Sequence, residues 1–130
     1  MAGDGLTAAV LNGWLNTLKG TAYTAAQAAY AQLHTGDPGS AGTANVSAGD
    51  TTRQALTFTT SAAESLALTS SPTAWTNGGT SETITNISLW TASTAGTFVG
   101  SVTLTASKAW AASDTLTLNT CTITLSPLAS

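Results

Sequence analysis

Apolar and polar residues alternate with a period of two through most of the chain after Arg53, and this pattern constrains the fold most. In successive segments, Leu, Ile, Phe or Val stands at every second position and threonine commonly fills the place between. Side chains of a strand point alternately to the two faces of a sheet, so each run predicts a strand with one buried face. Threonine also favours strands and supplies polarity without charge.

Turn-forming residues separate these runs. Asn77-Gly78-Gly79 is a strong turn signal, and further turns are expected at 94–96 and at 112–114. About seven or eight short strands separated by such turns are typical of an antiparallel β-sandwich, here expected to be jelly-roll-like. The expected strands are 30–35, 53–59, 66–69, a short segment at Trp75, 83–91, 97–104, 116–118 and 121–125.

A short helix is expected before the first strand, over about 6–18. Its apolar positions are Leu6, Val10, Leu11, Trp14, Leu15 and Leu18. Asp4 is the candidate N-cap, and Gly20 is a plausible stop. A helix of this length is marginal in water on its own, so its apolar stripe must pack on the chain's own sheet or on another molecule. Both alternatives stay open at this point.

The length of 130 residues fits one domain, 1–130. Within it we expect an N-terminal helix and docking segment at 4–20. A β-sandwich would follow at 28–126, with a Gly-rich loop at 36–50 that is dense in turn formers.

Charged residues make up only 7% of the chain, against about 25% in an ordinary soluble domain, and the net charge is −3. Phosphate binding needs clustered Lys or Arg, so three scattered cations exclude a nucleic-acid partner. No apolar run approaches the length of a membrane span, so no membrane partner is expected. No secretory signal is visible at the N-terminus.

Few residues could carry catalysis or bind a metal. His34, Asp37 and Asp50 could be combined into such a site, but a metal needs three or four convergent ligands and the sequence has no second histidine. We expect His34 and Asp37 to satisfy backbone groups in a turn instead. Glu64 and Glu82 could pair for glycoside hydrolysis, but both lie beside turns and are expected at solvated strand ends. We therefore predict no enzyme, no catalytic residue, no metal and no cofactor.

Among the remaining candidates, Cys121 lies in an alternating strand pattern and is expected to be a buried, inert thiol. Trp90 is expected to be packed, whereas Trp110, flanked by small residues near a turn, is the best candidate for an exposed contact, including one with a sugar. The candidate interface residues are Leu6, Val10, Leu11, Trp14, Leu18 and Trp110.

Two regions carry a family resemblance. The first is Ala-Gln-Leu-His-Thr-Gly-Asp-Pro-Gly at 31–39, followed by Gly-Thr-Ala-Asn-Val-Ser at 42–47 and Arg-Gln-Ala-Leu-Thr-Phe at 53–58. The second is Ile-Thr-Asn-Ile-Ser-Leu-Trp-Thr-Ala-Ser-Thr-Ala-Gly-Thr-Phe at 84–98. With the helix-first layout they resemble small virion proteins of tailed bacteriophages, especially of actinobacterial hosts, labelled head decoration, minor tail or tail fibre proteins. The resemblance extends over about 30–125 and carries no catalytic residues.

The resemblance implies a β-rich structural protein present in many copies on the particle. The first expectation is a capsid decoration protein, assembled in the host cytoplasm as a homotrimer, that binds the major capsid protein on the outside of the head and stabilises it. The alternative is a tail fibre or minor tail protein that faces the host, with Trp110 and the turn loops on cell-surface glycan. A virion cell-wall hydrolase is disfavoured by the missing catalytic residues.

Overall fold

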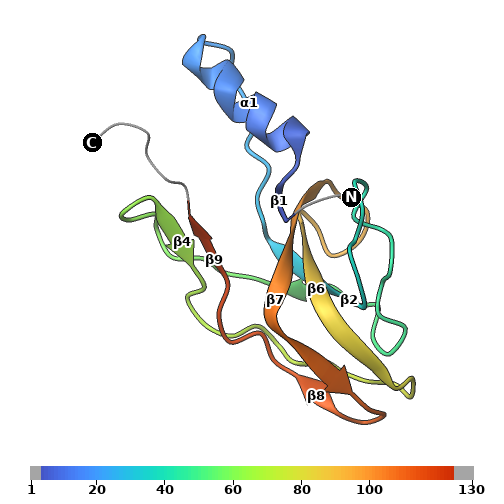
Figure 1. Cartoon of the computed structure of the whole chain (residues 1–130). Coiled ribbons are helices and arrows are strands. Elements are labelled where there is room, and N and C mark those ends of the chain that lie inside the picture. Colours follow the sequence, from blue (N-terminus) through green and yellow to red (C-terminus); the bar gives the residue numbers. More distant parts are fainter. Residues whose placement is uncertain (1–3, 125–130) are drawn as a thin grey trace.

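The structure, a computed structural model, describes residues 4–124. Figure 1 shows a helix that projects from a body of β-strands. In the described residues the elements are, in chain order, β1 (Gly5–Leu6), α1 (Ala8–Leu18), β2 (Tyr30–His34), β3 (Gln54–Ala55), β4 (Ser65–Ala67), β5 (Trp75–Thr76), β6 (Glu82–Trp90), β7 (Phe98–Trp110), β8 (Thr115–Leu116) and β9 (Thr122–Thr124).

All strand pairs given for residues 4–124 are antiparallel. The main sheet has the order β1-β7-β6-β2-β3, and two smaller ladders pair β4 with β9 and β5 with β8. The longest pairing joins β6 to β7, from Glu82 opposite Trp110 to Trp90 opposite Phe98. The expectation of a mainly β, sandwich-like fold with a short N-terminal helix is therefore confirmed. None of the helices in the described part of the chain is long and apolar enough to cross a membrane.

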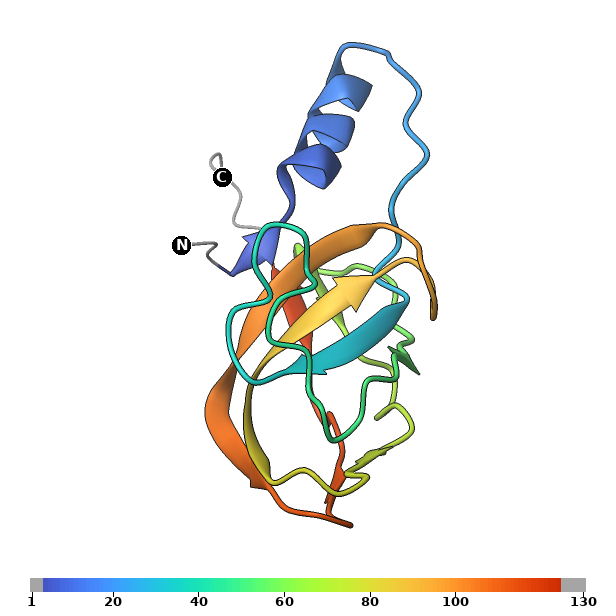
Figure 2. The same cartoon turned by 90° about the vertical axis from the view of Figure 1, so that its right-hand side faces the viewer.

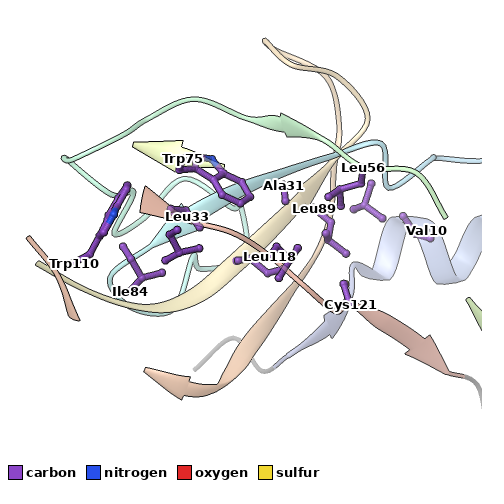
Figure 3. Close-up of a cluster of buried hydrophobic side chains, with 13 residues drawn as sticks. Val10, Ala31, Leu33, Leu56, Trp75, Ile84, Leu89, Trp110, Leu118 and Cys121 are labelled. Atoms are coloured by element: carbon purple, nitrogen blue, oxygen red, sulfur yellow. The ribbon is translucent and has the colours of Figure 1, made fainter. Parts of the chain in front are cut away.

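The hydrophobic core lies along the main sheet and is closed by the segments that form the smaller ladders. Figure 3 shows the cluster running from Trp110 at one end to Val10 of α1 at the other. Leu33 of β2 and Ile84 of β6 are fully buried within it. Burying one such side chain contributes about 1.5–3 kcal/mol, so this cluster is the main source of stability.

The second half of the middle strand β6, residues 86–90, is buried on both faces. Ile87 and Leu89 join the core, whereas Asn86, Ser88 and Trp90 alternate with them and are also buried. This second face is covered in part by the Gly-rich loop expected at 36–50, which lies beside β2 and β6 in Figure 2. A simple alternation of apolar and polar residues therefore understates how completely the central strand is enclosed.

Several local expectations were wrong, and the strand expected at 53–59 is reduced to β3, Gln54–Ala55. The helix is capped by Thr7, whose hydroxyl accepts a hydrogen bond from the Val10 amide, and not by Asp4. Leu6 precedes the helix and pairs with β7 as part of β1. The strand expected at 97–104 continues to Trp110, because β6 starts at Glu82 and gives β7 a partner along that length. Leu125, the last expected strand position, lies outside the described residues.

Candidate functional site

Helix α1 is the feature that stands out from the compact body. Figures 1 and 2 show it projecting beyond the main sheet, with the chain returning beside it before entering β2. Its 11 residues carry no acidic side chain in the first turn and no basic one in the last. Gly20, with a φ of 84°, ends the helix as expected, and its amide donates to the Thr17 carbonyl.

The apolar stripe of α1 is divided between two environments. Val10 is buried in the chain's own core, and Trp14 is half-buried against it. Leu11, Leu15 and Leu18 are 41%, 62% and 84% exposed. The helix therefore packs on its own sheet with one side of the stripe and leaves the other side uncovered.

The inner side of α1 is fixed by a close contact with the returning chain. Gly13 is buried, and a side chain there would overlap the ring of Tyr23. The Tyr23 hydroxyl in turn accepts a hydrogen bond from the Ala26 amide at 3.4 Å. The absence of a side chain at position 13 lets the returning segment lie directly on the helix.

An apolar crevice of about 460 Å³ opens beside the base of the helix. Its lining includes Leu6, Trp14, Ala26, Phe58, Leu66 and Ile123, and no charged residue. A smaller hollow of about 270 Å³ shares Trp14, Leu66 and Ile123 with it and adds Glu64 at its edge. The volume of the crevice lies within the range of about 300–1,000 Å³ that binding pockets occupy.

A wider and more polar groove, of about 690 Å³, runs between β7 and the segment 115–122. Six threonines are among its lining residues, Lys108 is its charged residue, and Leu104 and Leu118 supply apolar surface. No tryptophan, tyrosine or phenylalanine lines it. The groove therefore lacks the aromatic face on which sugars commonly stack.

The expectation of an exposed Trp110 is wrong. Its side chain is 1% exposed, and its indole N–H donates to the Asp114 carbonyl at 2.9 Å. Asn77 holds the same corner, because its side-chain amide donates to the carbonyls of Thr80 and Trp110. Small neighbours made Trp110 look accessible in the sequence, but this corner encloses it.

His34 and Ser88 form the contact that most resembles catalytic chemistry. The His34 Nε2 atom lies 2.7 Å from the Ser88 Oγ, and the Trp90 indole N–H donates to the same Oγ at 2.7 Å. His34 Nδ1 lies 2.8 Å from the Ala44 carbonyl, which can only accept, so Nδ1 carries the proton and Nε2 accepts from Ser88.

This serine–histidine pair is enclosed. His34 and Ser88 are both 0% exposed. Burial lowers the pKa of His34, and the nearby charge of Arg53 lowers it further, against the opposing effect of the hydrogen bond to Ala44. A nucleophile must reach its substrate, so the pair is suited to joining β2 and β6 to the Gly-rich loop and not to attacking a substrate.

The acidic candidates have structural roles. Asp37 accepts a hydrogen bond from the Gly39 amide, as expected for a turn, and Asp50 accepts from Thr52 and Thr76. Glu82 was expected at a solvated strand end, but its half-buried carboxylate accepts from Ser47, Ala48 and Gly49 at the end of the Gly-rich loop. Within residues 4–124 no group of three His, Cys, Asp or Glu side chains is placed to hold a metal ion.

Two further polar or ionisable side chains contribute to stability. Arg53 lies 3.6 Å above the ring of Trp90 and donates to the carbonyls of Ala92 and Ala95, so it fixes the turn between β6 and β7. Cys121 is buried, as expected, and burial raises the pKa of its thiol, which keeps it in the unreactive protonated form.

Only some of the six expected interface residues lie at the surface. Leu11 and Leu18 are exposed, Trp14 and Leu6 are half-buried, and Val10 and Trp110 are in the core. Leu15, which lies on the same stripe, belongs to the exposed set. The sequence could have added Leu15 to the interface candidates, because it follows Leu11 by four residues and precedes Leu18 by three.

Comparison with known protein families gives a match. A family model described as Podophage GP4 fiber I protein gp80 matches residues 5–126, which is nearly the whole chain. No curated protein matches the chain.

Proposed function

The chain belongs to the family of the podophage GP4 fiber I protein gp80, and from this premise we propose that it is a structural subunit of a phage tail fibre. Family membership makes it a bacteriophage structural protein associated with the virion, as the sequence resemblance implied. The description of the family favours the tail-fibre alternative over the capsid decoration protein that was the first expectation.

The structure supports a structural role in two ways. The buried polar groups serve the fold: His34, Asn77 and Glu82 each join segments distant in sequence. The uncovered surface of α1 and the crevice beside it are apolar, which suits contact with another protein subunit. We keep the homotrimer as part of the proposal, and an actinobacterial host stays a prediction of the sequence resemblance.

Contact with the host belongs to the same proposal, but not through Trp110, because that side chain is buried. The groove along β7 is lined by six threonines and is a candidate surface for that contact. The proposal of a non-enzymatic role thus rests on the enclosed serine–histidine pair and on the structural use of Glu82.

Particles that lack the protein test the proposal. We expect them to adsorb poorly to host cells while the temperature at which their heads rupture stays unchanged. Resupplied protein should restore adsorption. Normal adsorption together with a lower rupture temperature would overturn the tail-fibre proposal and support a decoration protein bound to the major capsid protein, because a ligand that binds only the assembled shell stabilises it.

A further inference from the structure

The exposed part of α1 has the spacing of a helix–helix seam. Leu11, Leu15 and Leu18 are separated by four and then three residues, and exposed Ala8 continues the spacing by three toward the N-terminus. Positions three and four apart alternate along the contact line of coiled coils. A row of leucines exposed to water leaves apolar surface unburied, so this face has the composition of a covered one.

This leucine face, defined as Leu11, Leu15 and Leu18, is continuous with the crevice. Trp14 is three residues after Leu11 and four before Leu18, so it is their neighbour on the helix surface. The same Trp14 lines the crevice together with Leu66 and Ile123. The two features therefore form one apolar surface that runs from the helix onto the body.

The lack of charge on this surface limits the kinds of partner that could bind it. α1 and the lining of the crevice carry no charged residue, and the charges beside them include Lys19, which follows the helix, and Glu64 at the edge of the adjoining hollow. Helices that lie on membranes are commonly rich in Lys and Arg on their polar face, and α1 has Asn12 and Asn16 in that part of its surface. A partner surface that is also apolar and uncharged can cover it without burying an unpaired charge. A second copy of this chain presents such a surface.

The area of the surface restricts how copies meet. A stable interface buries about 800 Å² on each partner, and one face of a helix of 11 residues, about 16 Å long, cannot supply that alone. If the leucine face of one copy enters the crevice of the next, each copy buries both surfaces. Such a head-to-tail contact closes into a ring when the rotation between copies permits.

We propose that the leucine face of α1 in one copy seats against Trp14 and the crevice of a second copy, and that repetition of this contact closes a cyclic oligomer. The inference deepens the proposed function, on which it rests for the assembly of several copies into one fibre. In this contact Leu15 and Leu18 of one copy pack against Trp14 and Ile123 of the next copy.

Sedimentation of the purified full chain tests this contact. We expect the wild-type chain to sediment at a multiple of 12.9 kDa. The double variant Leu15→Ser/Leu18→Ser should dissociate, with the dissociation constant raised about tenfold or more. The matched control Asn12→Ser/Asn16→Ser changes two exposed residues of the same helix outside the leucine face and should leave the oligomer intact.

A monomeric wild-type chain, or a double variant that stays oligomeric, would overturn the inference. Far-ultraviolet circular dichroism, which reports the backbone fold, should be the same in both double variants, and Leu18→Ser alone repeats the test at the most exposed leucine. The proposed function fails separately: an oligomer held by α1 but found on the phage head would overturn the tail-fibre role alone. A monomer found on the fibre would overturn only the contact.

Discussion

The Nε2 atom of His34 and the hydroxyl of Ser88 meet at 2.7 Å inside the protein, although 54 positions separate them in the chain. The contact joins β2 to β6, and the second nitrogen of the same ring binds Ala44 in the Gly-rich loop. One neutral side chain thus connects three segments, which makes its protonation a measure of the stability of the fold.

We predict that stability falls as the pH drops below about 6.5, the ordinary pKa of histidine. The pKa of His34 is lowered in the folded protein by burial, so the unfolded chain takes up the proton first and is favoured in acid. The loss can reach about 1.4 kcal/mol per pH unit between the two pKa values. Urea unfolding from pH 7.5 to 5.0 measures it.

His34 is the sole histidine of the sequence, so the effect can be assigned to it. The variant His34→Gln should be less stable at pH 7.5 and should lose most of the pH dependence over this interval. An unchanged slope in that variant would show that another group is responsible.

Asn77 holds the corner at Trp110, and we predict that Asn77→Ala destabilises the protein by about 2–4 kcal/mol. Its side chain donates to the carbonyls of Thr80 and Trp110 and accepts from the amide of Gly79, and buried groups left without partners cost about 1–3 kcal/mol each. Thermal unfolding measures the loss. Asn119→Ala, at an exposed position, should change stability by less than about 0.5 kcal/mol, and equal effects would refute the role of Asn77.

Glu82 anchors the Gly-rich loop, and we predict that Glu82→Gln lowers the free energy of unfolding by about 1.5–3 kcal/mol. The carboxylate accepts from the amides of Ala48 and Gly49, and hydrogen bonds to a charged group are stronger than neutral ones. Glu64→Gln removes an exposed carboxylate and serves as the control. Hydrogen exchange of the Gly49 amide should become faster in the first variant only, and slow exchange in both would contradict the anchor.

Gly13 and Tyr23 are coupled through their contact on α1. In the Tyr23→Ala background we predict that Gly13→Ala stabilises the protein by about 0.5–1 kcal/mol, because alanine favours a helix. In the wild-type background the same change should gain nothing or destabilise, because the new side chain displaces the Tyr23 ring. A double-mutant cycle by chemical denaturation gives the coupling energy, and additive effects would contradict the contact.

Period-two patterning was sufficient to predict the mainly antiparallel fold, and helix spacing with Gly20 predicted α1 and its end. Turn chemistry also placed His34 and Asp37 against backbone groups, as the contacts with Ala44 and Gly39 confirm. These features depend on residues close together in sequence, where spacing and local propensity carry the information.

The burial of Trp110 and the role of Glu82 could not be predicted because each depends on a distant segment. Trp110 is enclosed by a corner that includes Asn77, 33 positions away, and Glu82 binds a loop 33 to 35 positions away. The helix stripe was read as one face that needs one partner. In the structure Val10 packs in the core, whereas Leu15 and Leu18 stay exposed. One part of the stripe therefore packs on the chain's own body, and the other part is left for the second alternative, contact with another molecule.

Imaging of labelled particles tests the central claim most directly. An antibody against the purified protein, detected with gold in electron micrographs of intact particles, locates the chain on the virion. The account predicts label on fibres at the tail and none over the head. Label distributed over the head surface, with bare fibres, would contradict the account.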